Sequence, residues 1–519
     1  MLQVIPKTIR PTPKTAYEDL SLAKTAPCEI RWTQRVGVLT RLGPPDTQKG
    51  TAIPYREASR YLNFPLGAFS LAAILLSLAL GCGSGPSSSS PPPSLTSIEI
   101  SPASAAIRLG VSQQYTAAGT YSDGTQRDVT SSVTWSSSQP AAVFVNNQNG
   151  RNGFATGIGE GTSTITASEG TVQATATLMV SNPMPRFAYV SPAAQGPEIG
   201  IYTEGADGSL SPIQGSPFLL AGANDMTIDP EGKFLFTVVE VTPGPPQAQF
   251  TVNSYAVDHD TGMFSSPPVS TLCCNDGISN LLLSPSEQVL QVNNESSIAT
   301  ISVDSMANLA LVGSTPIGSS SANASDIAME PAGKFIYAAI IIPSSVEAFA
   351  AQPSNGMLTE QDTVPITGPA PDFLVIDPTG QFLYVMHPAN DLQSFRIDGA
   401  SGGLTSIATT PTRGYPSAGA AHPSGKWIYV GMCCNGNPSI TGFSIDPGTG
   451  NLTEVTNVPT ANGGEPGIVV AEPTGRFLYV EENTGNGISI TDIFSIDPNS
   501  GALTLVSQQA LPVPSYFTF

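Results

Sequence analysis

Residues 377–384, with the sequence DPTGQFLY, form a phrase that occurs six times with small changes in this chain of 519 residues. The copies begin at Asp229, Ser284, Glu330, Asp377, His422 and Glu472, and the copy at Ser284 is degraded. The phrase therefore returns every 45 to 55 residues, from the middle of the chain to its end. A period of this length indicates a repeat protein.

Each copy is expected to form a hairpin of two buried strands. Pro378 fixes φ for a turn, Gly380 accepts a positive φ, and Phe382 opens the return strand. A second marker, Gly-x-Leu or Gly-x-Phe, predicts a hairpin between two outer strands. It begins at Gly208, Gly262, Gly356, Gly402, Gly450 and Gly501, and Ala307 replaces the glycine in one further unit. The two markers together predict seven four-stranded units, which is the pattern of a seven-bladed β-propeller.

The two ends of the repeat region predict how the ring closes. Residues 186–190, RFAYV, have the character of a second strand without a first, and residues 514–519, PSYFTF, that of a first strand without a second. We expect the C-terminal strand to complete the N-terminal blade. Closure of this kind removes exposed sheet edges.

The region before the repeats has three parts. Residues 61–81 carry no charge, follow Arg56 and Arg60, and end in ALG before Cys82, which resembles a bacterial lipoprotein signal and implies lipidation of Cys82. A membrane helix is the alternative, because the stretch is long enough to span a bilayer. The Ser/Pro-rich residues 82–94 favour the lipoprotein interpretation, because they have the composition of a tether. Residues 1–60 are either an unstructured extension or the result of a misassigned start.

Residues 95–182 have the pattern of a small β-sandwich. Short alternating strands are separated by turns, and the segment holds one tryptophan, Trp135, and no cysteine. The series YSDGT, DVT and VTWSS, at residues 121–137, resembles the bacterial Ig-like group 2 domain (BIG2). That resemblance implies a stalk or adhesion module without chemistry of its own.

The repeat region, residues 185–519, resembles the seven-bladed lactonase family. The residues that carry the resemblance are the repeated DPTGQFLY-type phrase, the YV that ends several copies, and the Gly-x-Leu hairpins. The family includes 6-phosphogluconolactonase-like and 3-carboxymuconate cyclase-like proteins and is related to the YVTN-repeat surface proteins. The resemblance implies the fold; the shared residues build turns and cores and do not by themselves carry an activity.

The charge and the cysteines of the chain bear on three questions: nucleic-acid binding, disulfide formation and metal binding. After residue 60 the chain holds 10 basic and 35 acidic residues, so it should repel nucleic acid. Four of the six cysteines form two adjacent pairs, Cys273-Cys274 and Cys433-Cys434. Outside the cytosol each pair can close as a disulfide; two reduced or buried thiols per pair is the alternative. The cysteine spacing gives no zinc signature, and we expect no cofactor or metal.

The candidate site is the mouth of the propeller channel, where the loops that enter the inner strands meet those that join second to third strands. Catalysis there would use His387, Arg413 and Asp372. Ligand binding would use Asn224, Ser325, Asp391, Ser417, Glu481 and Glu482. The acidic members are expected to form a solvated rim; a Ca²⁺ site is the alternative.

The sequence thus predicts an all-β protein, a seven-bladed β-propeller with an N-terminal Ig-like sandwich. We expect a monomer, anchored by lipid in the cell envelope, whose propeller binds a glycan, a small ligand or an envelope protein. The alternatives are a lactonase-family hydrolase or cycloisomerase acting on a lactone such as 6-phosphogluconolactone, and a purely structural spacer. Of the seven basic residues after residue 185, only Arg413 is placed for the mouth, which disfavours catalysis.

Overall fold

The computed structural model describes residues 92–148, 150–181, 187–192, 198–219, 223–242, 249–274, 280–294, 296–318, 323–434, 437–483, 489–511 and 514–519. Every regular secondary-structure element in these residues is a β-strand. In this part of the chain there is no helix with the length and apolar character needed to cross a membrane. Residues Ser88 to Phe519 form one compact unit.

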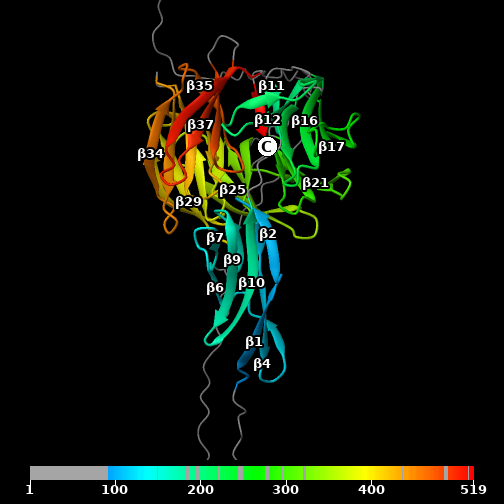
Figure 1. The fold of residues 1–519 in the computed structure, drawn as a ribbon, viewed down its shortest axis with the longest axis vertical. Coiled ribbons are helices and arrows are strands. Elements are labelled where there is room, and N and C mark those ends of the chain that lie inside the picture. The colour runs from blue at the N-terminus through cyan, green and yellow to red at the C-terminus, as the bar shows by residue number, and fades with distance from the viewer. Residues whose placement is uncertain are drawn as a thin grey trace, which may run out of the picture. The chain divides into compact units, whose positions relative to one another are not determined.

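The strands between residues 95 and 181 form the predicted sandwich, coloured blue to cyan in Figure 1. One sheet holds β1 (Leu95–Ser101), β4 (Thr116–Tyr121) and β5 (Gln126–Asp128). The second holds β2 (Ser104–Arg108), β10 (Val172–Ser181), β9 (Gly161–Glu169) and β6 (Thr134–Ser137). A third holds β3 (Ser112–Gln114), β8 (Phe154–Gly157) and β7 (Val143–Val145). Trp135 lies buried in the core beside Tyr115, as an Ig-like sandwich requires.

Seven further sheets form the blades of the propeller (Figure 1). Blade 1 holds β39 (Pro514–Thr518), β11 (Ala188–Pro192), β12 (Glu198–Glu204) and β13 (Leu210–Pro212), and β14 (Phe218–Leu219) pairs with β12. Blade 2 holds β15 (Ala223–Ile228), β16 (Phe234–Thr242), β17 (Gln249–Ala256) and β18 (Ser270–Cys274). Blade 3 holds β19 (Asn280–Leu283), β20 (Val289–Asn293), β21 (Ser297–Val303) and β22 (Leu309–Pro316).

The remaining four blades also follow the chain in order. Blade 4 holds β23 (Ala324–Met329), β24 (Phe335–Ile340), β25 (Ser345–Ala351) and β26 (Leu358–Pro365). Blade 5 holds β27 (Phe373–Ile376), β28 (Phe382–Met386), β29 (Asp391–Ile397) and β30 (Leu404–Pro411). Blade 6 holds β31 (Tyr415–Ala421), β32 (Trp427–Cys433), β33 (Ser439–Ile445) and β34 (Leu452–Pro459). Blade 7 holds β35 (Glu465–Ala471), β36 (Phe477–Asn483), β37 (Ser489–Ile496) and β38 (Leu503–Gln509). The predicted fold class is confirmed.

The two repeated markers meet between neighbouring blades. The tyrosine that ends a phrase donates a hydrogen bond to the glycine carbonyl of the next blade's outer hairpin, as Tyr337 does to Gly402 and Tyr429 to Gly501, each at 2.9 Å. The aromatic residue that opens the return strand packs against the same glycine, because a Cβ at Gly402 would overlap the ring of Phe335. The Gly-x-Leu marker therefore holds a glycine for packing as well as for its φ of +75°.

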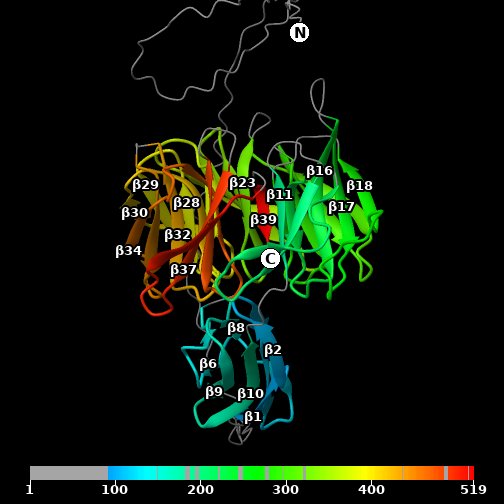
Figure 2. The same cartoon turned by 45° about the horizontal axis from the view of Figure 1, so that its top comes forward.

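The ring closes as the chain ends predict. Strand β39 pairs antiparallel with β11, with Val190 opposite Phe517, and completes blade 1. Figure 2 shows β39, in red, beside β11. Phe517 stacks on Tyr479 of blade 7 with 5.3 Å between the ring centroids, so the closing strand pairs within blade 1 and also packs against blade 7. The predicted closure is confirmed.

Candidate functional site

The propeller has two ends, and each end carries a different set of loops. We call one end the turn face; it carries the repeated turns at residues 229–233, 330–334, 377–381, 422–426 and 472–476. Each of these turns joins a first strand to a second strand. Because neighbouring strands are antiparallel, the other end carries the loops that enter the first strands and those that join second to third strands. We call this end the mouth.

Blade 5 brings three of the predicted site residues together at the mouth. His387 follows β28 and is 1% exposed, and its Nε2 lies 2.9 Å from Asp391 Oδ1 and 3.0 Å from Gln393 Nε2. Its Nδ1 has no hydrogen-bond partner among the described residues. Burial raises the pKa of Asp372, and the nearby His387 opposes that shift. His387 is thus enclosed, whereas the half-buried Asp372 and Asp391 are open to a ligand.

Arg413, the third residue assigned to catalysis, is engaged elsewhere. Its guanidinium makes a two-pronged ion pair with Glu454 of the outer strand β34, with 2.7 Å from Nη2 to Oε1 and 3.1 Å from Nε to Oε1. Both side chains are exposed. The position of Arg413 in the chain, just ahead of β31, does not reveal which outer-strand carboxylate lies within reach of it. The sequence-based grouping of Arg413 with His387 and Asp372 is not seen in this structure.

The two serines predicted to bind ligand at the mouth, Ser325 and Ser417, link neighbouring blades. Ser325 Oγ donates to the carbonyl of Pro371, at 2.6 Å, and Ser417 Oγ donates to that of Pro466, at 2.7 Å. Each bond joins the inner strand of one blade to the chain entering the next. The hydroxyls are therefore used within the scaffold. The backbone of Asn224 lies in β15, but its side chain is outside the described residues.

Two buried aspartates, which directly follow Asn224 and Ser325 in the chain, were missed by the sequence analysis. Asp225 Oδ2 accepts the amide of Leu281, at 2.6 Å, and Asp326 Oδ2 accepts that of Leu374, at 2.8 Å, so both bond to the next blade. Burial raises the pKa of Asp225 to about 8 and that of Asp326 to about 7. The signal was present, because an aspartate at the same place in two inner strands, 223–228 and 324–329, marks a position inside the ring.

Glu481 and Glu482 do not form a solvated rim, because they are 7% and 0% exposed, and that expectation is wrong for them. Glu482 accepts the backbone amides of Asn462 and Gly464 and so fixes the loop that enters blade 7. It also faces the buried Asp492. Burial, followed by the hydrogen bond to Glu482, raises the pKa of Asp492 to about 7.

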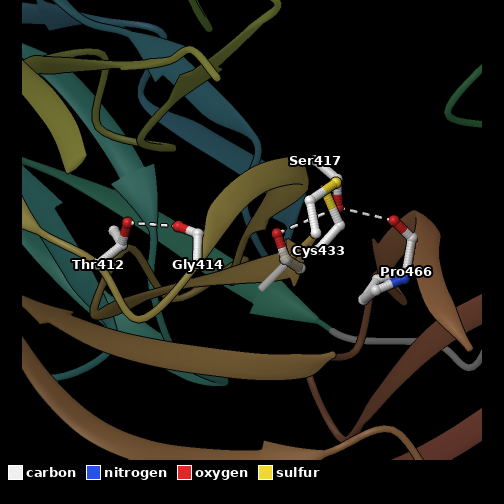
Figure 3. The surroundings of a disulfide bond; sticks show 7 residues. Thr412, Gly414, Ser417, Cys433 and Pro466 are labelled. Carbon is white, nitrogen blue, oxygen red and sulfur yellow. Dashed lines mark hydrogen bonds between the residues drawn. A yellow bond between two sulfur atoms is a disulfide. The ribbon is translucent and has the colours of Figure 1, made fainter. Parts of the chain in front are cut away.

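A disulfide joins Cys433 and Cys434 at the mouth end of β32. Figure 3 shows it next to Ser417, with Thr412 donating to the carbonyl of Gly414 nearby, at 2.7 Å. Cys434 is exposed and has a φ of +69°. The bridge thus places a compact apolar group at the mouth of blade 6. The side chains of Cys273 and Cys274, and the whole of Cys82, lie outside the described residues.

The described side chains show no arrangement of three or more His, Cys, Asp or Glu residues that could hold a metal ion. Three of the four acidic residues considered for Ca²⁺ are used in two separate ways, and the fourth, Glu481, is buried. Asp372 and Asp391 lie near His387, and Glu482 binds backbone amides. What the mouth can do chemically is therefore to accept hydrogen bonds through partly exposed carboxylates that lie beside a buried histidine.

Comparisons with known proteins agree with this architecture. The model of the family "Lactonase, 7-bladed beta-propeller" matches residues 251–419 and 413–519, and that of the "Bacterial Ig-like domain (group 2)" matches residues 94–180. Ice-binding protein 1 of Shewanella frigidimarina is 42% identical over 88 residues, which are 17% of this chain and 9% of that protein. The chain therefore spans less than a tenth of this relative's length.

Solved structures share the propeller fold. A periplasmic gluconolactonase of Pseudomonas aeruginosa matches with a TM-score of 0.55 and 22% identity, over 64% of this chain and 98% of that one. A Bacteroides fragilis protein described as a candidate 6-phosphogluconolactonase matches with a TM-score of 0.54 and 19% identity, over 64% and 96%. Because the two lactonase matches together cover more than half of the sequence, this chain belongs to the seven-bladed β-propeller lactonase family, with a bacterial Ig-like domain of group 2 ahead of the propeller.

Proposed function

We propose that the propeller binds an uncharged, hydroxyl-rich ligand, a glycan or a neutral sugar derivative, at its mouth. The observation that carries this proposal is the charge of the mouth in blade 5. The partly exposed Asp372 and Asp391 present oxygen acceptors, and Arg413 is neutralised by Glu454. Sugar hydroxyls donate to carboxylates, whereas a phosphate or carboxylate on the ligand would be repelled.

A lactone hydrolase is the second candidate, and the cluster around His387 favours it. The structural neighbours of this chain include proteins described as a gluconolactonase and a candidate 6-phosphogluconolactonase. In such a reaction Asp372 would accept a proton from the attacking water, and His387 would hold Asp391 in place. Stabilising the oxyanion needs a cation or aimed donors. The one basic residue predicted to lie at the mouth, Arg413, is bound to Glu454.

Hydrolysis assays separate the two candidates. The full chain would be tested with D-glucono-1,5-lactone and with its 6-phosphate, alongside the variants His387→Gln and Asp372→Asn and the control Asp446→Asn, an exposed hairpin residue far along the chain. The binding proposal predicts rates equal to the uncatalysed reaction for all four proteins. Turnover that falls at least about tenfold in His387→Gln and Asp372→Asn, but not in Asp446→Asn, would establish the hydrolase instead.

Anchoring to the cell envelope belongs to the same proposal. Its support is the sequence alone: an uncharged stretch at 61–81, Cys82, and a Ser/Pro tether. The propeller would then be displayed on a lipid-anchored stalk as a monomer. Mass spectrometry of the membrane-extracted protein should find a diacylglyceryl group on Cys82, and Cys82→Ser should release the protein into the soluble fraction. An unmodified Cys82 in a membrane-bound protein would contradict lipid anchoring.

A further inference from the structure

We propose that Arg151 is a latch that holds the Ig-like domain against the turn face of the propeller. Arg151 lies between β7 and β8 of the sandwich and is 2% exposed. Its Nη1 lies 3.0 Å from Oε2 of Glu330, the fully buried acid of the blade 4 turn. An arginine in a surface connection of a small domain is normally solvated. Here the propeller buries it.

Blade 5 is shaped to receive this side chain. A Cβ at Gly399 or Gly380 would overlap the arginine, so both positions need glycine to leave room for it. The residue that corresponds to Gly399 in four other outer hairpins has a side chain: His259, Pro353, Pro447 and Pro498. Only blade 5, next to the blade 4 turn, opens this space among the five hairpins. The outer hairpin of blade 5 therefore differs from the other four hairpins at the position where Arg151 packs.

Opposite charges surround the arginine, and two hydrogen bonds join the two domains beside it. The arginine interacts electrostatically with the carboxyl groups of Asp377 and Asp398 as well as with Glu330. Gln148 donates to the side chain of Gln381, at 2.9 Å, and Lys334 Nζ donates to the carbonyl of Gly150, at 2.8 Å. A cation buried among carboxylates is stable only while both sides are present.

The position of Arg151 also shows which end of the propeller contacts the Ig-like domain. The turn at 377–381 leaves β27 and enters β28, whereas the loop at 387–390 lies at the opposite end of β28. Arg151 therefore engages the end of the propeller that lies away from the mouth. This inference does not rest on the proposed function, but it implies that the mouth stays open to a ligand when the stalk is attached.

Hydrogen exchange of the full chain tests the latch. Arg151→Met and Glu330→Gln each leave one buried charge without its partner, so amides between β7 and β8 and in the turn at 377–381 should exchange at least about tenfold faster. The double variant should recover part of this protection, because it buries neither charge. The matched control is Arg127→Met, which removes an exposed sandwich pair with Asp123 and should leave exchange unchanged.

Gly399→Ala keeps both charges but displaces the arginine, and it decides the case if Arg151→Met loses protection in the core strands β9 and β10. The latch predicts faster exchange between β7 and β8 in this variant, with β9 and β10 still protected. Exchange equal to that of the unaltered chain in Arg151→Met, or in Gly399→Ala if Arg151→Met unfolds, would overturn the proposal. Equal effects of Arg127→Met and Arg151→Met would overturn it too.

Discussion

The two ends of the propeller use the same residue types in different ways. At the turn face, four of the six phrases begin with an acid that accepts backbone amides of its own turn, as Asp229 does from Lys233, Glu330 from Lys334 and Glu472 from Arg476. At the mouth the polar groups differ from blade to blade, with His387 and Asp372 in blade 5 and a disulfide in blade 6. Repetition thus marks residues that build the scaffold, and a residue found in one blade only is the better candidate for function.

Removing the closing strand should have the largest effect. Without residues 514–519, blade 1 loses its inner strand and Tyr479 loses the ring stacked on it. An unpaired inner strand and a lost aromatic contact should lower the free energy of unfolding by about 4 kcal/mol or more. Urea unfolding followed by tryptophan fluorescence, which Trp427 in blade 6 reports, measures this. An unchanged midpoint would show that the ring does not depend on closure.

Asp377→Ala should come next, because it breaks the scaffold pattern at the turn face. The 1% exposed carboxyl of Asp377 accepts the amides of Thr379, at 3.0 Å, and Phe382, at 2.7 Å, and alanine leaves both donors unpaired. We expect a loss of about 3 kcal/mol in the free energy of unfolding. Asp446→Ala, at an exposed hairpin cap, is the comparison and should cost about 1 kcal/mol. Equal losses would remove the distinction between buried turn acids and surface caps.

The pH dependence of stability tests the buried acids near the mouth. The pKa is raised to about 8 for Asp225 and to about 7 for Asp326 and Asp492, from ordinary values of 3.8. These groups bind more protons in the folded state than in the unfolded state, so the free energy of unfolding should fall as the pH rises from about 4 to about 8. Each group contributes at most about 1.4 kcal/mol per pH unit.

Asp326→Asn should flatten that decline, since asparagine cannot ionise. Urea midpoints of the wild type and the variant at pH 5, 6, 7 and 8 give the two slopes. Parallel slopes would mean that Asp326 is already ionised across this range.

Ser417→Ala should have the smallest effect. It removes one hydrogen bond between blades 6 and 7, at 2.7 Å, and should lower the free energy of unfolding by about 1 kcal/mol. The same variant sharpens the functional question, because a mouth serine that contacts ligand would also weaken binding. Because the Ser417 hydroxyl is already used within the scaffold, calorimetric titration with a neutral sugar lactone should show the same affinity for the variant and the wild type. Weaker binding would return Ser417 to the binding site.

The fold could be predicted from the sequence because its signals are local and repeated. A turn such as 377–381 carries its proline, its glycine and its acid within a few residues, and the closing strand is evident from what the two chain ends lack. The candidate site could be predicted only in part. His387, Asp391 and Asp372 lie close to one another in the chain and meet in blade 5.

The errors arose where contacts cross between distant segments. The partner of Arg413 is 41 residues away, and the burial of Glu482 depends on Asn462 and Gly464 in an earlier loop. No spacing along the chain predicts such contacts. Arg151 is the extreme case, because its partner lies in another domain.

In this propeller the scaffold uses the repeated charges, and the mouth is left acidic. Calorimetric titration of the full chain with D-glucono-1,5-lactone and with its 6-phosphate tests this most directly. We expect the neutral lactone to bind, with weaker binding in Asp372→Asn, and the phosphate to bind at least about tenfold more weakly. Tighter binding of the phosphate than of the neutral lactone would contradict this expectation.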